Sequence, residues 1–278
     1  MKDYATPFDT LHAASLLSHR SRLEKFRGAI RRVVEPDSHV VDLGTGTGVL
    51  AMMAAKAGAR KVTAIDINGE SLEYARRAAA LNGLDRSVEF RMCHFKDYLP
   101  EEKADVVICE MLSSMMLIEQ QIPAAAHANH RVLKSGGEML PSSVTVFGVP
   151  VECEAGWNRF ALEDLRFPLV PQTVEKSQTR DLSNLKTIAH FNLLKVTETT
   201  RVDCSLSFEV LEEGTMHGLL GMFEAVLVPG TNLQMEDGWR ELLIPLEKPL
   251  RVSEGDRIVL RLAYKPGVYD SLVLELAP

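Results

Sequence analysis

The sequence has 278 residues, of which 46% are hydrophobic and 25% are charged. This composition is typical of soluble globular proteins and excludes a largely disordered chain, and the length is sufficient for two domains of ordinary size. The formal net charge of −7 argues against a nucleic-acid-binding surface and is compatible with a cationic substrate.

Neither a metal site nor a membrane segment is predicted. The four cysteines (Cys93, Cys109, Cys153 and Cys204) are far apart and form no CxxC pair, so we expect reduced thiols rather than zinc ligands or disulfides. The opening MKDYATPFDTLH lacks the apolar core of a signal peptide, and no run of about 18 apolar residues follows it. We therefore expect a cytoplasmic protein that does not bind a membrane.

The first half of the sequence alternates between strand and helix patterns. Short apolar runs that are typical of strands occupy residues 39–46, 61–68, 87–95 and 104–110. Helical patterns with glycines at or near their ends occupy residues 49–59, 69–83 and 122–137. This alternation predicts a Rossmann-like α/β domain with a doubly wound parallel sheet over residues 1–140.

The second half of the sequence is rich in β-type patterns. From about Pro141 onward, strand-like runs occupy residues 144–153, 189–198, 202–212, 217–228, 241–247, 256–264 and 271–277. Turn signals such as VPGTN and SEGD separate many of these runs. The pattern predicts a β-barrel-like C-terminal domain over residues 141–278, and the more polar stretch 154–188 allows no prediction.

The first chemical signal is a glycine-rich turn between a predicted strand and a predicted helix. It contains Asp42, Gly44, Gly46 and Gly48, and the glycines allow the backbone to approach a ligand closely. The third glycine comes one residue too early for the GxGxxG pattern of dinucleotide sites. An acid before the turn suits a cationic ligand without phosphates, although a purely structural turn is the alternative.

Asp66 ends the next predicted strand, about twenty residues further on. A carboxylate at that point can accept hydrogen bonds from both hydroxyls of a ribose. Together with the glycine turn, this residue indicates a site for S-adenosylmethionine. Phe95, at the end of the following strand, is the candidate apolar contact of the adenine, with a purely structural core role as the alternative.

Two glutamates flank an apolar, methionine-rich stretch in CEMLSSMMLIEQ, residues 109–120. Glu110 ends the fourth predicted strand, at the sheet edge where open α/β folds bind their ligands, and Glu119 follows at a distance that lets the chain fold back. Two carboxylates in one apolar pocket suit a planar guanidinium, because each carboxylate can accept two N–H hydrogen bonds from it. The alternative is that Glu110 contacts another small substrate and Glu119 is a solvated helix residue.

The glycine turn, the CEMLSSMMLIEQ segment and a β-rich second half that begins at a proline after GGEML together resemble the protein arginine methyltransferase family. This resemblance implies an S-adenosylmethionine-dependent N-methyltransferase in which Glu110 and Glu119 form the catalytic pair that holds the substrate arginine. It also implies that Asp66 holds the ribose and that 4–20 is the cofactor-covering helix. The cofactor-binding residues that the resemblance implies are His12, Arg20, Asp42, Gly44, Thr45, Gly46, Asp66, Ile67 and Phe95, with Arg22 as the alternative to Arg20 for the methionine carboxylate.

Several positions differ from the family pattern. The tryptophan, glycine and tyrosine that the family carries between its glutamates are Met111, Ser113 and Ser114 here. The family's threonine-histidine-tryptophan loop is reduced to residues 237–239, and the acidic partner of that histidine is absent from residues 15–18. The stretch 154–188 is short for the family's dimerisation arm, so a dimer is in doubt.

These differences leave the methyl acceptor open. A protein, a peptide or a small guanidine is the preferred acceptor. The alternatives are an enzyme of the same architecture that modifies a small molecule, a ribosomal protein or another amine or hydroxyl, and a non-catalytic binding module.

Overall fold

The computed structural model describes residues 10–276. Residues 4–9 of the predicted cofactor-covering helix and the last residue of the predicted strand 271–277 lie outside this range. No helix among the described residues is long and apolar enough to cross a membrane.

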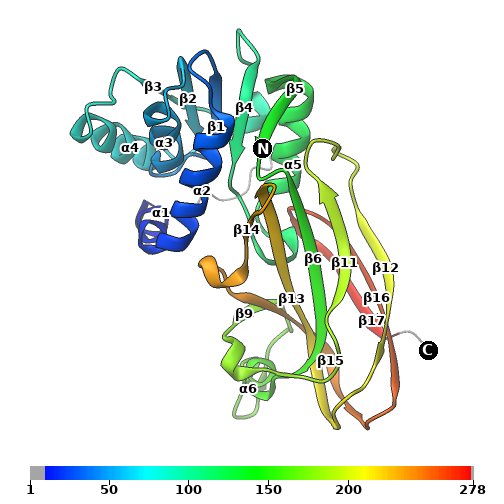
Figure 1. The fold of residues 1–278 in the computed structure, drawn as a ribbon. Coiled ribbons are helices and arrows are strands. Elements are labelled where there is room, and N and C mark those ends of the chain that lie inside the picture. Colours follow the sequence, from blue (N-terminus) through cyan, green and yellow to red (C-terminus); the bar gives the residue numbers. More distant parts are fainter. Residues whose placement is uncertain (1–9, 277–278) are drawn as a thin grey trace.

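A five-stranded parallel sheet forms the N-terminal half, in the order β3-β2-β1-β4-β5. Its strands are β1 (His39–Leu43), β2 (Lys61–Asp66), β3 (Val88–Met92), β4 (Ala104–Cys109) and β5 (Leu133–Leu140). All five residues of β1 are buried, as expected for a central strand that is covered on both faces. This architecture confirms the Rossmann-like prediction (Figure 1).

Helices cover this sheet and one side of its carboxyl edge. They are α1 (Thr10–Ser15), η1 (Leu16–Ser18), α2 (Arg20–Val33), α3 (Val49–Lys56), α4 (Gly69–Leu81) and α5 (Gln121–His127), followed by a π-turn over Ala128–Val132. Helix α2 buries Leu23, Phe26 and Ile30, which recur every three or four residues and so share one face. Asn68 caps the N-terminus of α4, because its side chain accepts hydrogen bonds from the amides of Glu70 and Ser71.

The predicted helix over residues 122–137 is wrong in its last part. The helix ends early, and residues 133–140 form strand β5, which pairs in parallel with β4. Gly137 is not a helix terminator: a Cβ on this residue would lie 2.8 Å from the carbonyl oxygen of Asp105, so the glycine permits the two strands to approach. Pairing with the open edge of β4 therefore overrides the local helix signal.

The C-terminal half is built from strands, as predicted, and the structure shows that they pair antiparallel. One sheet has the order β10-β6-β13-β15-β9, with β11 beside β6 and β14 beside β13, and a second sheet has the order β12-β16-β17. The strands are β6 (Ser143–Glu152), β9 (Gln172–Val174), β10 (Arg180–Asp181), β11 (Lys186–Asn192), β12 (Val202–Glu209), β13 (Gly214–Val228), β14 (Thr231–Leu233), β15 (Glu241–Val252), β16 (Arg257–Lys265) and β17 (Val268–Leu276). Strand β11 ends at Asn192, so the predicted strand 189–198 is wrong in its second part.

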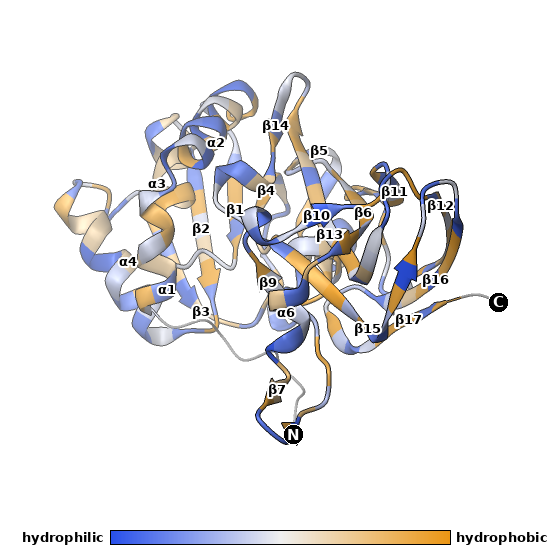
Figure 2. Cartoon of the chain, turned by 90° about the horizontal axis from the view of Figure 1, so that it is seen from below, coloured by the Kyte–Doolittle hydropathy of each residue, from blue (hydrophilic) through white to orange (hydrophobic). Residues whose placement is uncertain are grey.

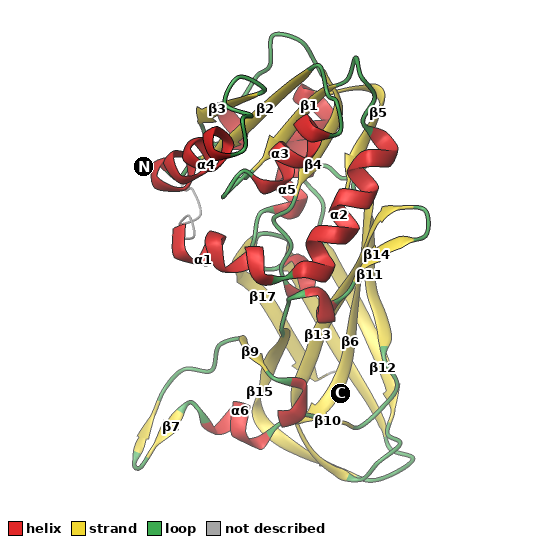
Figure 3. Ribbon diagram, turned by 60° about the vertical axis from the view of Figure 1, so that its left-hand side comes forward, coloured by secondary structure: helices red, strands yellow, loops and turns green. Residues whose placement is uncertain are grey.

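The stretch that the sequence left unassigned contains little helix. Besides the short strands β9 and β10, it forms the short helix α6 (Glu154–Asn158) and a small hairpin of β7 (Ala161–Leu162) and β8 (Leu165–Arg166). This hairpin projects from the body of the molecule (Figure 3).

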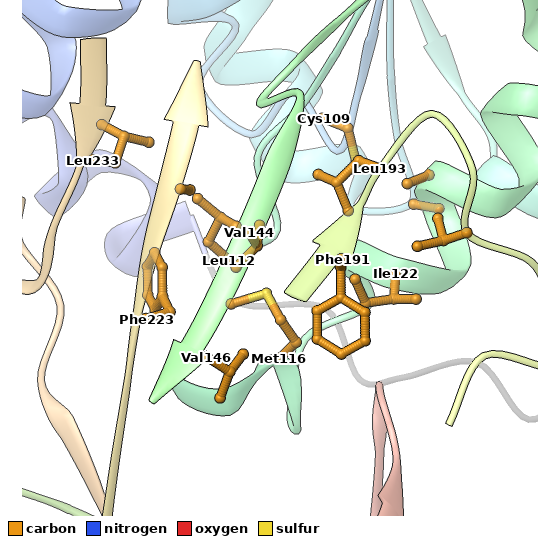
Figure 4. Close-up of a cluster of buried hydrophobic side chains, with 14 of the residues drawn as sticks. Cys109, Leu112, Met116, Ile122, Val144, Val146, Phe191, Leu193, Phe223 and Leu233 are labelled. Carbon is orange, nitrogen blue, oxygen red and sulfur yellow. The ribbon is translucent and has the colours of Figure 1, made fainter. Parts of the chain in front are cut away.

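One hydrophobic cluster joins the two halves. Hydrophobic residues are frequent in the strands of both halves (Figure 2), and many of them are buried in this cluster. Figure 4 shows the junction, where Leu112 and Met116 from the loop after β4 lie among Val144 of β6, Phe191 of β11 and Phe223 of β13. The parallel sheet, the loop that carries the two glutamates and the antiparallel strands therefore share one core.

Candidate functional site

A cavity of about 1030 Å³ lies at the carboxyl ends of β1, β2 and β4, between the parallel sheet, the N-terminal helices and the loop before β15. Its lining includes His12, Asp42, Gly44, Thr45, Gly46, Asp66, Ile67, Phe95, Glu110 and Glu119. The structure thus brings together all the residues that the sequence assigned to cofactor binding or catalysis, with the exception of Arg20.

The structure places Arg22, not Arg20, in this cavity. Arg20 is solvent-exposed, whereas Arg22 is buried and lines the cavity. Two residues along an α-helix correspond to a rotation of about 200°, so the two side chains leave nearly opposite faces of α2. The correct choice depends on where α2 faces the sheet, which a local sequence pattern does not determine.

The glycine turn between β1 and α3 adopts a conformation that requires glycine. Gly44, Gly46 and Gly48 have φ angles of 74°, 51° and 76°, all in the left-handed region. At Gly48, a Cβ would lie 3.0 Å from both the Ala75 methyl and the Phe90 ring. The turn therefore exposes backbone to the cavity while α4 and β3 pack closely behind it.

Asp42 is a buried acid at the base of this turn. Its carboxylate accepts a hydrogen bond of 2.6 Å from the Thr45 hydroxyl, and the residue is only 1% exposed. Burial raises the pKa of Asp42 to about 7, although the Thr45 hydrogen bond favours the ionised form. A positively charged ligand group nearby would offset the cost of the buried charge.

Asp66 is held rigidly at the end of β2. One carboxylate oxygen accepts the Gly46 N–H and the other accepts the Asn68 N–H, both at 2.8 Å. Burial raises the pKa of Asp66, and these backbone hydrogen bonds oppose that effect. Each carboxylate oxygen can accept a further hydrogen bond, so the side chain can bind two ligand hydroxyls without moving.

The two glutamates line the same cavity, and the buried Arg22 binds Glu110 and interacts electrostatically with Glu119. Arg22 donates a hydrogen bond from Nη2 to the Glu110 carboxylate, and its guanidinium lies 5.0 Å from the centre of the Trp239 ring. Burial raises the pKa of Glu119 to about 8, and the charge of Arg22 partly opposes this rise. Burial also lowers the pKa of Arg22 to about 10. When both carboxylates are ionised, they exceed the single guanidinium by one negative charge, and a bound cation would favour this ionised form of Glu119.

The loop before β15, which contains residues 237–239, contacts helix α2 through two residues that the sequence analysis did not single out, Ser21 and Lys25. The Asp237 carboxylate accepts hydrogen bonds of 2.5 Å from the Ser21 hydroxyl and from the Lys25 ammonium. Next to it, Gly238 lies directly against the His19 ring, where a Cβ would not fit. The sequence lacks both members of the family's contact between a loop histidine and a helix acid. In this structure the loop and the helix are instead joined by an acid on the loop, Asp237, and a base on the helix, Lys25.

The remaining predicted residues have plainer surroundings. Phe95 lines the cavity, and the centroid of its ring lies 4.3 Å from that of the His94 ring. The His94 side chain accepts a hydrogen bond from the Lys96 amide. No group of three His, Cys, Asp or Glu side chains among residues 10–276 could hold a metal ion.

These residues fit S-adenosylmethionine. The glycine backbone and Asp42 can receive the cationic amino acid part, and Asp66 presents a fixed carboxylate to the ribose. Arg22 keeps one buried donor, Nε, without a hydrogen-bond partner, and this donor can serve an incoming carboxylate.

Comparisons with known proteins agree with this assignment. A family model described as "Ribosomal protein L11 methyltransferase (PrmA)" matches residues 27–142. The chain is 44% identical over 108 residues to an uncharacterized protein, MJ1452, of Methanocaldococcus jannaschii (39% of this chain, 41% of the other). It is 35% identical over 144 residues to a probable protein arginine N-methyltransferase 6.1 of Oryza sativa subsp. indica (51% and 37%), and 27% identical over 250 residues to protein arginine N-methyltransferase 2 of Xenopus tropicalis (79% and 58%).

The fold also matches a solved structure. The Trypanosoma brucei PRMT1 enzyme-prozyme heterotetrameric complex with AdoHcy has a chain that superposes with a TM-score of 0.78 at 23% identity, covering 94% of this chain and 91% of that one. The matched part of the chain spans about two fifths of the length of the first curated relatives.

A parallel sheet with a glycine turn after β1 and an acid at the end of β2 is the arrangement of the S-adenosylmethionine-dependent methyltransferases, and the chain is of that class. The relatives extend beyond this sheet into the antiparallel half. Within the class, the chain is similar to protein arginine methyltransferases in both sequence and fold.

Proposed function

We propose that the chain transfers a methyl group from S-adenosylmethionine to a guanidinium nitrogen of an arginine side chain in a protein or peptide, held between Glu110 and Glu119. The observation that carries this proposal is that both carboxylates line one cavity with the glycine turn and that Glu110 already binds a guanidinium, that of Arg22. The chemistry that recognises a guanidinium is therefore present next to the cofactor residues.

The protein's part in this reaction is positioning and charge balance. When bound, S-adenosylmethionine supplies an electrophilic methyl group. Glu110, fixed by Arg22, holds one edge of the acceptor guanidinium so that a nitrogen faces the methyl carbon. Glu119, with a pKa of about 8, is the group that accepts the proton released when that nitrogen is methylated.

The test replaces each glutamate by glutamine and measures methylation of an arginine-containing peptide. We expect Glu110→Gln and Glu119→Gln each to lower kcat by about 100- to 1,000-fold, as loss of a preorganised charged group does. Binding of S-adenosylhomocysteine, measured by calorimetry, should change little, and the exposed Glu101→Gln should behave as the wild type. Unchanged turnover in both active-site variants would refute the guanidinium proposal.

The pH dependence gives an independent check. If Glu119 must be ionised, kcat/KM of the wild type rises with pH up to about 8 and is flat above that value, because the pKa of Glu119 is raised. In Glu119→Gln this rise should be absent.

An amine acceptor is the second candidate, favoured by the match of residues 27–142 to a ribosomal protein methyltransferase model. Ser113 and Ser114 stand where bulkier side chains would narrow the cavity, and both line it. The same peptide assay with lysine in place of arginine distinguishes the two: methylation of the lysine peptide alone would replace the guanidinium proposal.

A further inference from the structure

The loop that carries the two glutamates has an unusual backbone at its midpoint. Met115 and Met116 are consecutive and have φ angles of 62° and 54°, in the left-handed region that side chains other than glycine rarely adopt. Such a conformation persists only where the surrounding structure holds it in place.

Here the surrounding structure is the β16–β17 hairpin, more than 140 residues away in the sequence. The buried Tyr264 donates a hydrogen bond of 2.9 Å from its hydroxyl to the carbonyl oxygen of Met115. The Gly267 amide donates one of 2.9 Å to the carbonyl oxygen of Met116. In return, the Gln120 side-chain amide donates to the carbonyl oxygen of Gly267 at 2.6 Å.

Packing adds to these hydrogen bonds. The Met115 side chain is fully buried and fills the space beside Gly221 in the centre of β13, where a Cβ would overlap its sulfur. The antiparallel half thus supplies the hydrogen-bond partners of the left-handed turn and, at Gly221, the space that the Met115 side chain fills.

The turn is connected to the second glutamate. The Ser113 hydroxyl accepts hydrogen bonds from the amides of Ile118 (3.3 Å) and Glu119 (3.1 Å), which closes the loop on itself across Met115 and Met116. Any shift of the turn is therefore passed directly to the backbone of Glu119.

We propose that Tyr264, together with Gly267 in the turn between β16 and β17, is a positioning residue for the methyl-acceptor site: it fixes the turn at Met115 and Met116 and thereby the place of Glu119. The inference rests on the proposed function for the role of Glu119. The glycine turn that receives the cofactor lies in the parallel sheet and has its own hydrogen bonds, from the Gly44 and Thr45 amides to the Ile65 carbonyl. Loss of the Tyr264 hydroxyl should consequently impair turnover of the methyl acceptor and leave cofactor binding unchanged.

The test compares Tyr264→Phe with Tyr269→Phe, which removes the same hydroxyl from an exposed position on the same hairpin. Three quantities are measured for each variant: amide hydrogen exchange of residues 111–120, methylation kinetics with an arginine peptide, and binding of S-adenosylhomocysteine. We expect Tyr264→Phe to accelerate exchange in this segment by about tenfold and to lower kcat several-fold, with less than a twofold change in cofactor affinity. Tyr269→Phe should match the wild type in all three.

A second variant tests the same contact independently, in case Tyr264→Phe does not fold. Gly267→Ala places a side chain on a residue with a φ angle of 74° and a Cβ only 2.9 Å from the Gln120 amide nitrogen, so it should disturb the same turn from the other partner. Wild-type exchange and kcat in both Tyr264→Phe and Gly267→Ala would overturn the proposal. If the wild type methylates no arginine peptide, the proposed function fails, whereas the exchange data still decide whether the hairpin holds the loop.

Discussion

Replacing Asp42 with asparagine should stabilise the fold at neutral pH even though it damages the cofactor site. Asp42 is 1% exposed, and its carboxylate has one side-chain donor, the Thr45 hydroxyl. Asparagine keeps an oxygen that can accept this hydrogen bond, but it carries no charge. The variant therefore removes the cost of a buried ionised group, while the hydrogen bond from the Ala51 backbone to this side chain adds a contribution that does not depend on pH.

The magnitude follows from the pKa of Asp42. Burial raises it from 3.8 to about 7 in the folded protein, so between these values the folded state holds a proton that the unfolded state has lost. The free energy of unfolding of the wild type must then fall as pH rises through this window, by about 1.4 kcal/mol per pH unit and about 4 kcal/mol in total. Below pH 4 and above pH 7 this contribution is constant.

Urea unfolding at pH 4, 5, 6, 7 and 8 measures the effect as the difference between Asp42→Asn and the wild type. That difference should grow in favour of the variant up to pH 7 and then stay level, and the exposed Asp37→Asn should show no such trend. A difference between Asp42→Asn and the wild type that is the same at every pH would refute the reasoning.

Three further predictions concern the other parts of the site. Asp66→Ala should weaken binding of S-adenosylhomocysteine by about 1–3 kcal/mol, because ligand hydroxyls lose their acceptor; calorimetry showing no loss would move the ribose contact elsewhere. Gly48→Ala should lower the free energy of unfolding by at least about 1–2 kcal/mol, because alanine is strained at a φ angle of 76°. Gly28→Ala lies in the middle of α2 with no atom near the new methyl group, so it should raise the free energy of unfolding by about 0.5–1 kcal/mol in the same urea experiment. Asp237→Asn and Lys25→Met should show a coupling of about 1 kcal/mol in a double-mutant cycle, and additive effects would mean that their 2.5 Å contact does not hold α2 in place.

The parts of the site that the sequence predicted are determined by short patterns at the ends of neighbouring strands. A glycine turn between a strand and a helix, and an acid at the end of the next strand, are brought together by the parallel sheet itself, so Asp42, Gly44, Gly46 and Asp66 all reach one cavity. Glu110 and Glu119 reach it as well, since both lie at the ends of one loop that starts at the carboxyl end of β4.

The parts that the sequence could not predict depend on distant partners. The hydrogen bond between Lys25 and Asp237 joins residues 212 positions apart, and no local pattern marks Lys25 or pairs it with Asp237. The choice between Arg20 and Arg22 depends on the orientation of α2 against the rest of the molecule. Strand β5 was misassigned because its glycines resemble a helix end, while its real determinant is the free edge of β4.

The hydrophobic cluster between the two halves has a consequence for how the chain unfolds. Leu112 and Met116 belong to the loop that carries the glutamates, yet their apolar neighbours Val144 and Phe223 belong to the antiparallel strands. A truncation at Pro141 would therefore expose this cluster to water and leave the acceptor loop without support. Melting should accordingly be a single cooperative event, and a ligand bound above the parallel sheet should protect amides as far away as β13.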